Sequence, residues 1–266
     1  EKLLAEYPKH EVVPGIYAEM MASWTKTGAF DKAMDTAEKM LAQDPGDLEP
    51  ALAALKAAEA KKDAGAVRKW AVLASDMARK RIQGSKGPDE DDELFKQRVD
   101  FAKQLDTYSE YALYASALQV PNAADKAALL KTLDQRAPES KYLPQSYGVY
   151  FQALTQTGDF AAAVPVAEKA IAAGRATEEM LASASDFYLR SNKEPQKVLD
   201  YSSKLIELAN TRPKPDGVSD ADWAKRKSYF LGAGHWFAGA QLVSQTKYAE
   251  GDKELRIALP MLEGND

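Results

Sequence analysis

The stretch that decides the fold is Pro144 to Arg175, PQSYGVYFQALTQTGDFAAAVPVAEKAIAAGR. Its first half places large apolar residues at three- and four-residue spacing, on one face of a helix: Tyr147, Tyr150, Phe151 and Leu154. Gly158-Asp159-Phe160 then predicts a tight turn. After the turn, Ala163, Ala167 and Ala170 form a small-residue face on a second helix. A large face opposite a small face predicts a close antiparallel helix pair, whose exposed flank needs further pairs stacked on it.

The composition is that of a globular, helix-rich chain. Of its 266 residues, 45% are hydrophobic and 28% charged, which is enough for a sizeable core. The net charge of −5 and the pI of about 5.3 argue against a nucleic acid as the main partner, because nothing supplies a basic stripe. The absence of cysteine excludes disulfides, thiolate metal sites and a cysteine nucleophile. No apolar run approaches the ~20 residues that a transmembrane helix needs.

The helix-pair pattern recurs along the whole chain. Six pairs begin near residues 14, 48, 108, 144, 178 and 232, so the intervals between starts are 34, 60, 36, 34 and 54 residues. The two long intervals predict insertions near 83–107 and 211–231 that lengthen two first helices, over 93–118 and 220–245.

Aromatic residues on first helices are expected to pack in the core. In the helix over 93–118, the register taken from Tyr108 predicts an inward face of Tyr111, Tyr114, Ala115 and Leu118.

The residues of these pairs resemble the tetratricopeptide repeat family. In the pair that starts at 14, the 34-residue pattern is matched by Tyr17, Met20, Trp24, Gly28, Phe30, Ala33, Ala37, Met40 and Pro45. The pair at 144 departs from it at Phe151, where a small residue is usual, and at Arg175, which replaces a proline. The resemblance, which is to bacterial members, implies an all-α, right-handed superhelical solenoid over residues 1–266, with about six helical hairpins and two elongated helices.

The same resemblance implies a binding groove along the concave face, lined by fixed positions of the first helices. The groove residues singled out for binding are Lys26, Gln152, Gln156, Asp186, Arg190, Trp236 and Ser244, and Ala233 is expected beside them. Trp236 is the expected apolar anchor, and glutamines can hydrogen-bond a peptide backbone. Lys26 alone does not make the carboxylate clamp that captures chaperone C-termini.

No catalytic or cofactor-binding pattern stands out. The two histidines, His10 and His235, lack metal-binding spacing, and His235 is expected to pack in the core. The acidic run Asp89 to Glu93 lacks the EF-hand pattern, and we expect it to open a helix. There is no glycine-rich phosphate loop and no GxSxG elbow. We therefore expect no enzyme activity, no metal and no cofactor.

The expected function is binding of a protein or peptide in the groove, or scaffolding of an assembly. The alternative is structural, with self-association through the long helices over 93–118 and 220–245. An enzyme or small-molecule binder would need a closed apolar pocket. The chain starts at Glu1 without methionine, and Glu1 to Tyr7 read as the end of a helix, so we expect a removed signal segment. Together with the absent cysteines and the resemblance to bacterial repeats, this favours a bacterial protein that is periplasmic or exported.

Overall fold

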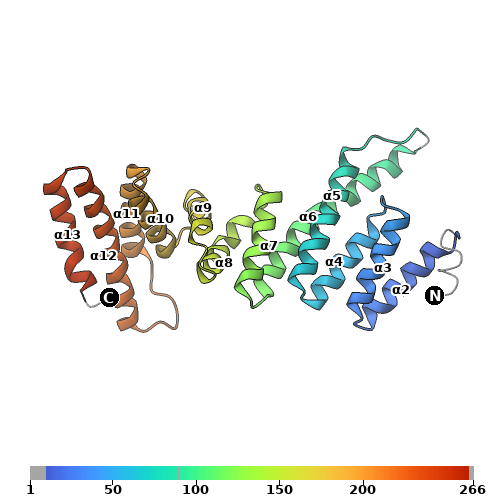
Figure 1. Ribbon diagram of the computed structural model, residues 1–266, viewed down its shortest axis with the longest axis horizontal. Helices are drawn as coiled ribbons and strands as arrows, with labels where there is room; N and C mark the ends of the chain where they lie inside the picture. The colour runs from blue at the N-terminus through green and yellow to red at the C-terminus, as the bar shows by residue number, and fades with distance from the viewer. Residues whose placement is uncertain (1–9, 89, 264–266) are drawn as a thin grey trace. The chain divides into compact units, whose positions relative to one another are not determined.

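The computed structural model describes residues 10–88 and 90–263, and this part of the chain is helical throughout (Figure 1). The helix expected over Glu1 to Tyr7 lies outside the described residues. The two long helices expected from sequence are present as α6 and α12. Within the described residues the twelve helices are α2 (Val13–Lys26), α3 (Phe30–Gln43), α4 (Glu49–Lys61), α5 (Ala64–Gln83), α6 (Asp92–Gln119), α7 (Ala123–Arg136), α8 (Leu143–Gln156), α9 (Phe160–Ala172), α10 (Glu178–Ser191), α11 (Pro195–Thr211), α12 (Asp220–Ser244) and α13 (Tyr248–Leu262).

Packing divides the chain into two compact units, residues 1–146 and 147–266, and the boundary falls inside α8. In both units a helix packs on its neighbours in sequence, as α5 does on α4 and α6 in the N-terminal unit. First helices of successive pairs also touch, α2 with α4 and α4 with α6 in one unit, and α10 with α12 in the other. This is the packing of an array of helical hairpins, and the all-α class with sequential neighbours is confirmed.

Five of the described connectors that join the two helices of a hairpin share one backbone device, which recurs between α9 and α10 at Gly174. In each, one residue adopts a left-handed conformation: Gly28, Lys62, Gly158, Asn192 and Thr246. The amide of the next residue then donates to the carbonyl five positions back, as Asp159 does to Leu154 at 2.9 Å. This bond satisfies a carbonyl that the helix end would leave unpaired. Two successive spacings equal the predicted period, 62 − 28 = 34 and 192 − 158 = 34 residues.

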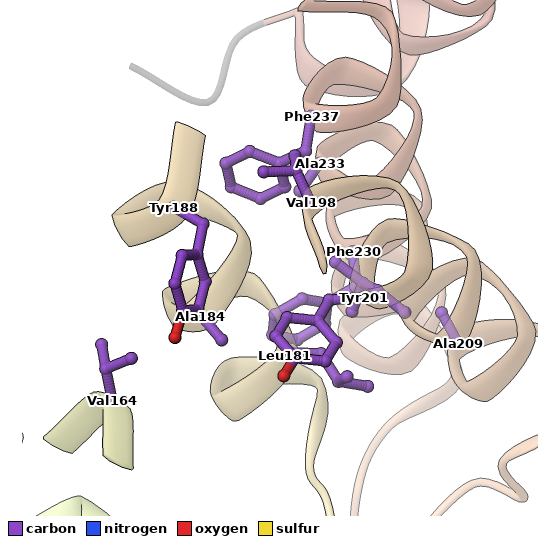
Figure 2. Close-up of a cluster of buried hydrophobic side chains, with 11 residues drawn as sticks. Val164, Leu181, Ala184, Tyr188, Val198, Tyr201, Ala209, Phe230, Ala233 and Phe237 are labelled. Carbon is purple, nitrogen blue, oxygen red and sulfur yellow. The ribbon is translucent and has the colours of Figure 1, made fainter. Parts of the chain in front are cut away.

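A buried cluster ties together the helices of the C-terminal unit (Figure 2). Its members come from α9, α10, α11 and α12: Val164, Leu181, Ala184, Tyr188, Val198, Tyr201, Leu205, Ala209, Phe230, Ala233 and Phe237. Figure 2 shows Val164 on α9, Tyr188 on α10 and Phe237 on α12 around this core. Burial of such side chains contributes about 1.5–3 kcal/mol each, so the cluster fixes α10 against α12.

The predicted inward face of α6 is wrong at two positions. Tyr111 is 44% exposed and Leu118 45% exposed. The face that α6 buries instead is built mainly of small residues and leucines: Ala102, Leu105, Ser109, Ala112, Leu113, Ser116 and Ala117. Alanines of α5, such as Ala74 and Ala78, pack on Ala102 and Leu105. Small side chains let the helices approach closely, which leaves the tyrosines outside.

Candidate functional site

An open hollow of about 730 Å³ lies in the C-terminal unit. Its walls come from three helices, α9, α10 and α12, which the buried cluster of Figure 2 holds together. The lining residues are Phe160, Ala163, Val164, Ala182, Ser183, Asp186, Phe187, Arg190, Ser191, Tyr229 and Phe237. Since most of these are apolar or aromatic, the hollow is suited to an apolar group of a ligand.

Helical periodicity explains why α10 serves both the core and the hollow. Leu181 and Tyr188 are seven residues apart and point into the core. Ala182, Asp186 and Arg190 follow one another at four-residue spacing and line the hollow. The sequence LASASDFYLR therefore presents one apolar stripe to α11 and α12, and a small and charged stripe to the hollow.

Three aromatic rings at the hollow are exposed to solvent, one from each helix: Phe160, Phe187 and Tyr229. Two of them are held by a buried neighbour. Phe187 meets Tyr188 edge to face with ring centroids 5.3 Å apart, and Tyr229 meets Phe230 in the same way at 5.2 Å. Rings fixed in this way lose little conformational freedom on binding, which favours them as binding anchors.

One ion pair borders the apolar walls. The Arg190 guanidinium donates to the Asp186 carboxylate at 2.7 Å, one helical turn away. The Arg190 side chain is 78% exposed. An exposed pair of this kind is worth little to folding, so either partner is free to exchange the other for a charged group of a ligand.

A polar network joins α9, α10 and α11. Oε1 of Glu168 accepts hydrogen bonds from Tyr188 (2.9 Å), Tyr201 (2.9 Å) and the Lys197 ammonium (2.8 Å). Burial alone would raise the pKa of Glu168, but the three donors outweigh it and hold that pKa below its ordinary value. Burial, aided by Glu168, raises the pKa of Tyr201 to about 12. The network therefore keeps a carboxylate charged and two phenols neutral.

The residues predicted to bind do not all meet at one place. Asp186 and Arg190 line the hollow. Trp236 on α12 is 41% exposed and packs edge to face on Phe237, but it is not among the lining residues. The remaining four are exposed outside the hollow: Lys26 at the end of α2 in the N-terminal unit, Gln152 and Gln156 on the part of α8 that belongs to the C-terminal unit, and Ser244 at the end of α12.

Two further residues, Ala233 and His235, were given expected positions from the sequence. Ala233, expected in the groove, is buried in the core cluster, because the α12 register turns it toward α11. His235, expected to pack in the core, is only partly buried, and its Nδ1 lies 2.6 Å from a carboxylate oxygen of Glu254 on α13. That pairing was not predicted, since nineteen residues separate the two side chains.

Sequence reasoning missed the three exposed rings of the hollow. One signal was present at Phe187 and Tyr188, because two adjacent aromatics on a helix cannot both face the same core. A similar adjacency occurs at Tyr229 and Phe230.

Neither the protein-family models nor the curated protein sequences contain a match to this chain. Among the residues that the structure describes, no group of three or more histidine, aspartate or glutamate side chains could hold a metal ion. None of the described helices combines the length and the apolar character needed to cross a bilayer.

Proposed function

We propose that this chain is a protein-interaction module that holds an apolar segment of a partner in the hollow between α10 and α12. The observation that carries the proposal is the convergence of three exposed rings, Phe160, Phe187 and Tyr229, on one open hollow. Exposed aromatic side chains gathered in this way mark interaction sites more often than scattered single ones do. Asp186 and Arg190 at the same hollow would orient the segment through a charged residue beside its apolar anchor.

The finer architecture belongs to the same proposal. We infer a right-handed solenoid of the tetratricopeptide type, in which first helices line the binding face. Two features support it, the 34-residue recurrence of left-handed turn residues and the contact between first helices α10 and α12. The proposed role is binding or scaffolding without catalysis. The acidic net charge favours a protein partner over a nucleic acid.

A displayed library of random peptides would test the binding site. We expect wild type to enrich peptides that share an apolar anchor. The double variant Phe187→Ala, Tyr229→Ala should bind those peptides at least about tenfold more weakly, since two anchors are removed. Leu259→Ala is the matched control, because Leu259 on α13 is 72% exposed and does not line the hollow. Equal binding by the double variant and wild type would exclude the hollow as the site.

A second candidate function is self-association through α12. Tyr229, Trp236 and Val243 are exposed and recur every seven residues, so they form one stripe along this long helix. Sedimentation velocity of wild type and Trp236→Ala separates the two functions. A wild-type dimer that the substitution dissociates would favour self-association. A monomer in both proteins would leave peptide binding as the function.

A further inference from the structure

Four tyrosines of the N-terminal unit form a ledge that the proposed function does not use. Tyr108, Tyr111 and Tyr114 lie on α6, and Tyr142 lies in the connector before α8. Ring centroids are 6.2 Å apart between Tyr108 and Tyr111, 5.7 Å between Tyr111 and Tyr142, and 5.3 Å between Tyr114 and Tyr142. The first two pairs are tilted by 41° and 58°, so these rings offer faces and edges to an incoming group.

An open hollow of about 400 Å³ lies along this tyrosine ledge. Its lining consists of Lys103, Gln104, Thr107, Tyr108, Tyr111 and Tyr142. The lining contains one cation and no carboxylate. The hydroxyls of Thr107 and Tyr108 already donate to the Lys103 carbonyl and to Glu59. The lining still offers the ammonium of Lys103 and the amide of Gln104 as donors to a ligand. It therefore suits a ligand that is apolar and rich in hydrogen-bond acceptors.

Three lysines, Lys56, Lys103 and Lys141, lie around the ledge, and the two carboxylates named beside them, Glu59 and Asp100, each have a partner in the protein. The ammonium of Lys56 lies 5.8 Å from the centre of the Tyr108 ring, and that of Lys141 lies 5.2 Å from the centre of the Tyr142 ring. The nearby carboxylate of Glu59 is engaged, since it accepts a hydrogen bond from the Tyr108 hydroxyl at 2.5 Å. Lys103 has Asp100 at 3.6 Å, a long and exposed contact that a ligand carboxylate can replace.

We propose that the tyrosine ledge binds a proline-rich segment that carries acidic residues. Proline has no amide hydrogen, so such a segment is apolar and offers carbonyl acceptors, which matches ring faces beside hydroxyl, amide and ammonium donors. Such a segment already adopts the extended polyproline II conformation before it binds, so it loses less conformational entropy on docking to an aromatic-lined groove. Acidic residues beside the prolines complement Lys56, Lys103 and Lys141.

Other ligand classes match the lining less well. A sugar also stacks on aromatic rings, but the lining has no carboxylate, the strongest acceptor for sugar hydroxyls. A quaternary ammonium would be repelled by the Lys103 ammonium, which belongs to the lining. A single-stranded nucleic acid needs a basic track, whereas this chain has a net charge of −5.

The test uses the full chain and a fluorescent decaproline peptide that ends in two aspartates. Fluorescence anisotropy should show saturable binding by wild type. Tyr111→Ala should weaken it at least about tenfold, because an exposed anchor ring is lost. Tyr248→Ala is the matched control, since its ring is 65% exposed, lies on α13 in the C-terminal unit and lines neither hollow, and this variant should bind as wild type does. Lys103→Gln should weaken binding of this acidic peptide and leave the affinity for uncharged decaproline unchanged.

Three results would overturn the proposal. In the first, wild type binds the proline peptide no more tightly than it binds a glycine-serine peptide of equal charge. In the second, a folded Tyr111→Ala variant binds the proline peptide as tightly as wild type does. In the third, wild type binds oligouridylate more tightly than the proline peptide. Tyr111 is exposed, so circular dichroism should show an unaltered fold in its variant. The ledge and the hollow between α10 and α12 lie in different units. A negative result for the ledge therefore does not contradict the proposed binding in the hollow, and a negative result for the hollow does not contradict the proposal for the ledge.

Discussion

At the residue scale, single turn residues set where each helix stops. Five connectors within hairpins need one residue in the left-handed region, and glycine holds only two of these positions, Gly28 and Gly158. Thr246 has φ 63° although it is β-branched, a conformation that L-residues with branched side chains avoid. This position therefore carries strain that the equivalent glycines do not.

Exchanging residue types at these turns should shift stability in opposite directions. Gly158→Ala should lower the free energy of unfolding by about 1 kcal/mol, because alanine must adopt a left-handed conformation. Thr246→Gly should raise it by about 0.5–1 kcal/mol, because the strain is relieved. Urea denaturation measures both. Gly148→Ala is the control, since Gly148 lies inside α8 with open space around it, and alanine there should stabilise the helix. A destabilised Thr246→Gly variant would contradict the account.

The Glu168 network makes a further residue-scale prediction, on pH. The pKa of Glu168 is lower in the folded chain than its ordinary value of 4.5, so the charged form is the one that folding favours. Its contribution to the free energy of unfolding is therefore fully present above pH 4.5 and is lost as the pH falls through the folded pKa. Glu168→Gln should be less stable than wild type at pH 7, with the difference shrinking in acid. A difference that stays constant from pH 7 to pH 3 would contradict this role.

At the element scale, glycines allow α12 and α13 to pack closely. A Cβ added at Gly239 would lie 2.7 Å from Leu255 and 3.1 Å from the backbone oxygen of Gly251. A Cβ added at Gly251 would meet Val243 at 2.6 Å and the Gly239 oxygen at 3.0 Å. The two glycines face each other, so neither backbone can tolerate a side chain without moving the partner helix.

Filling this contact should cost stability. Gly239→Ala is expected to lower the free energy of unfolding by about 1–3 kcal/mol, because the added methyl group forces the helices apart. Thermal and urea denaturation of the variant measure the loss. Gly15→Ala on α2 adds the same methyl group in open space and should stabilise, so a similar effect of both substitutions would refute close packing at Gly239.

The element scale also shows how far sequence reasoning reaches. Helix existence and turns were predictable, because three- and four-residue spacing and breakers such as Gly158 are local signals. The register of α6 was not predictable from the sequence. Tyr111 and Ala112 belong to two adjacent faces of this helix, and only the neighbouring helix decides which of the two faces is buried. For the same reason the Gly239–Gly251 contact and the three-helix hollow lie beyond a one-dimensional pattern.

At the scale of the whole molecule, the chain is an array of hairpins in two compact units, and each unit carries its own exposed aromatic surface. Packing buries small residues, leucines and part of the aromatic residues, such as Tyr188 and Phe237. The aromatic residues that the helices leave outside, Tyr111 in one unit and Phe187 and Tyr229 in the other, are then free for partners. Two residues of the groove expected from sequence, Asp186 and Arg190, line the hollow. The expected anchor of that groove, Trp236, does not line it.

The central claim is that the hollow between α10 and α12 binds a partner segment. Amide hydrogen exchange of the full chain, with and without a peptide enriched by wild type from the random library, tests it most directly. The account predicts slowed exchange around Ala182–Arg190 and Tyr229–Phe237, absent in the Phe187→Ala, Tyr229→Ala variant. Slowed exchange confined to other helices, or retained by that variant, would contradict it.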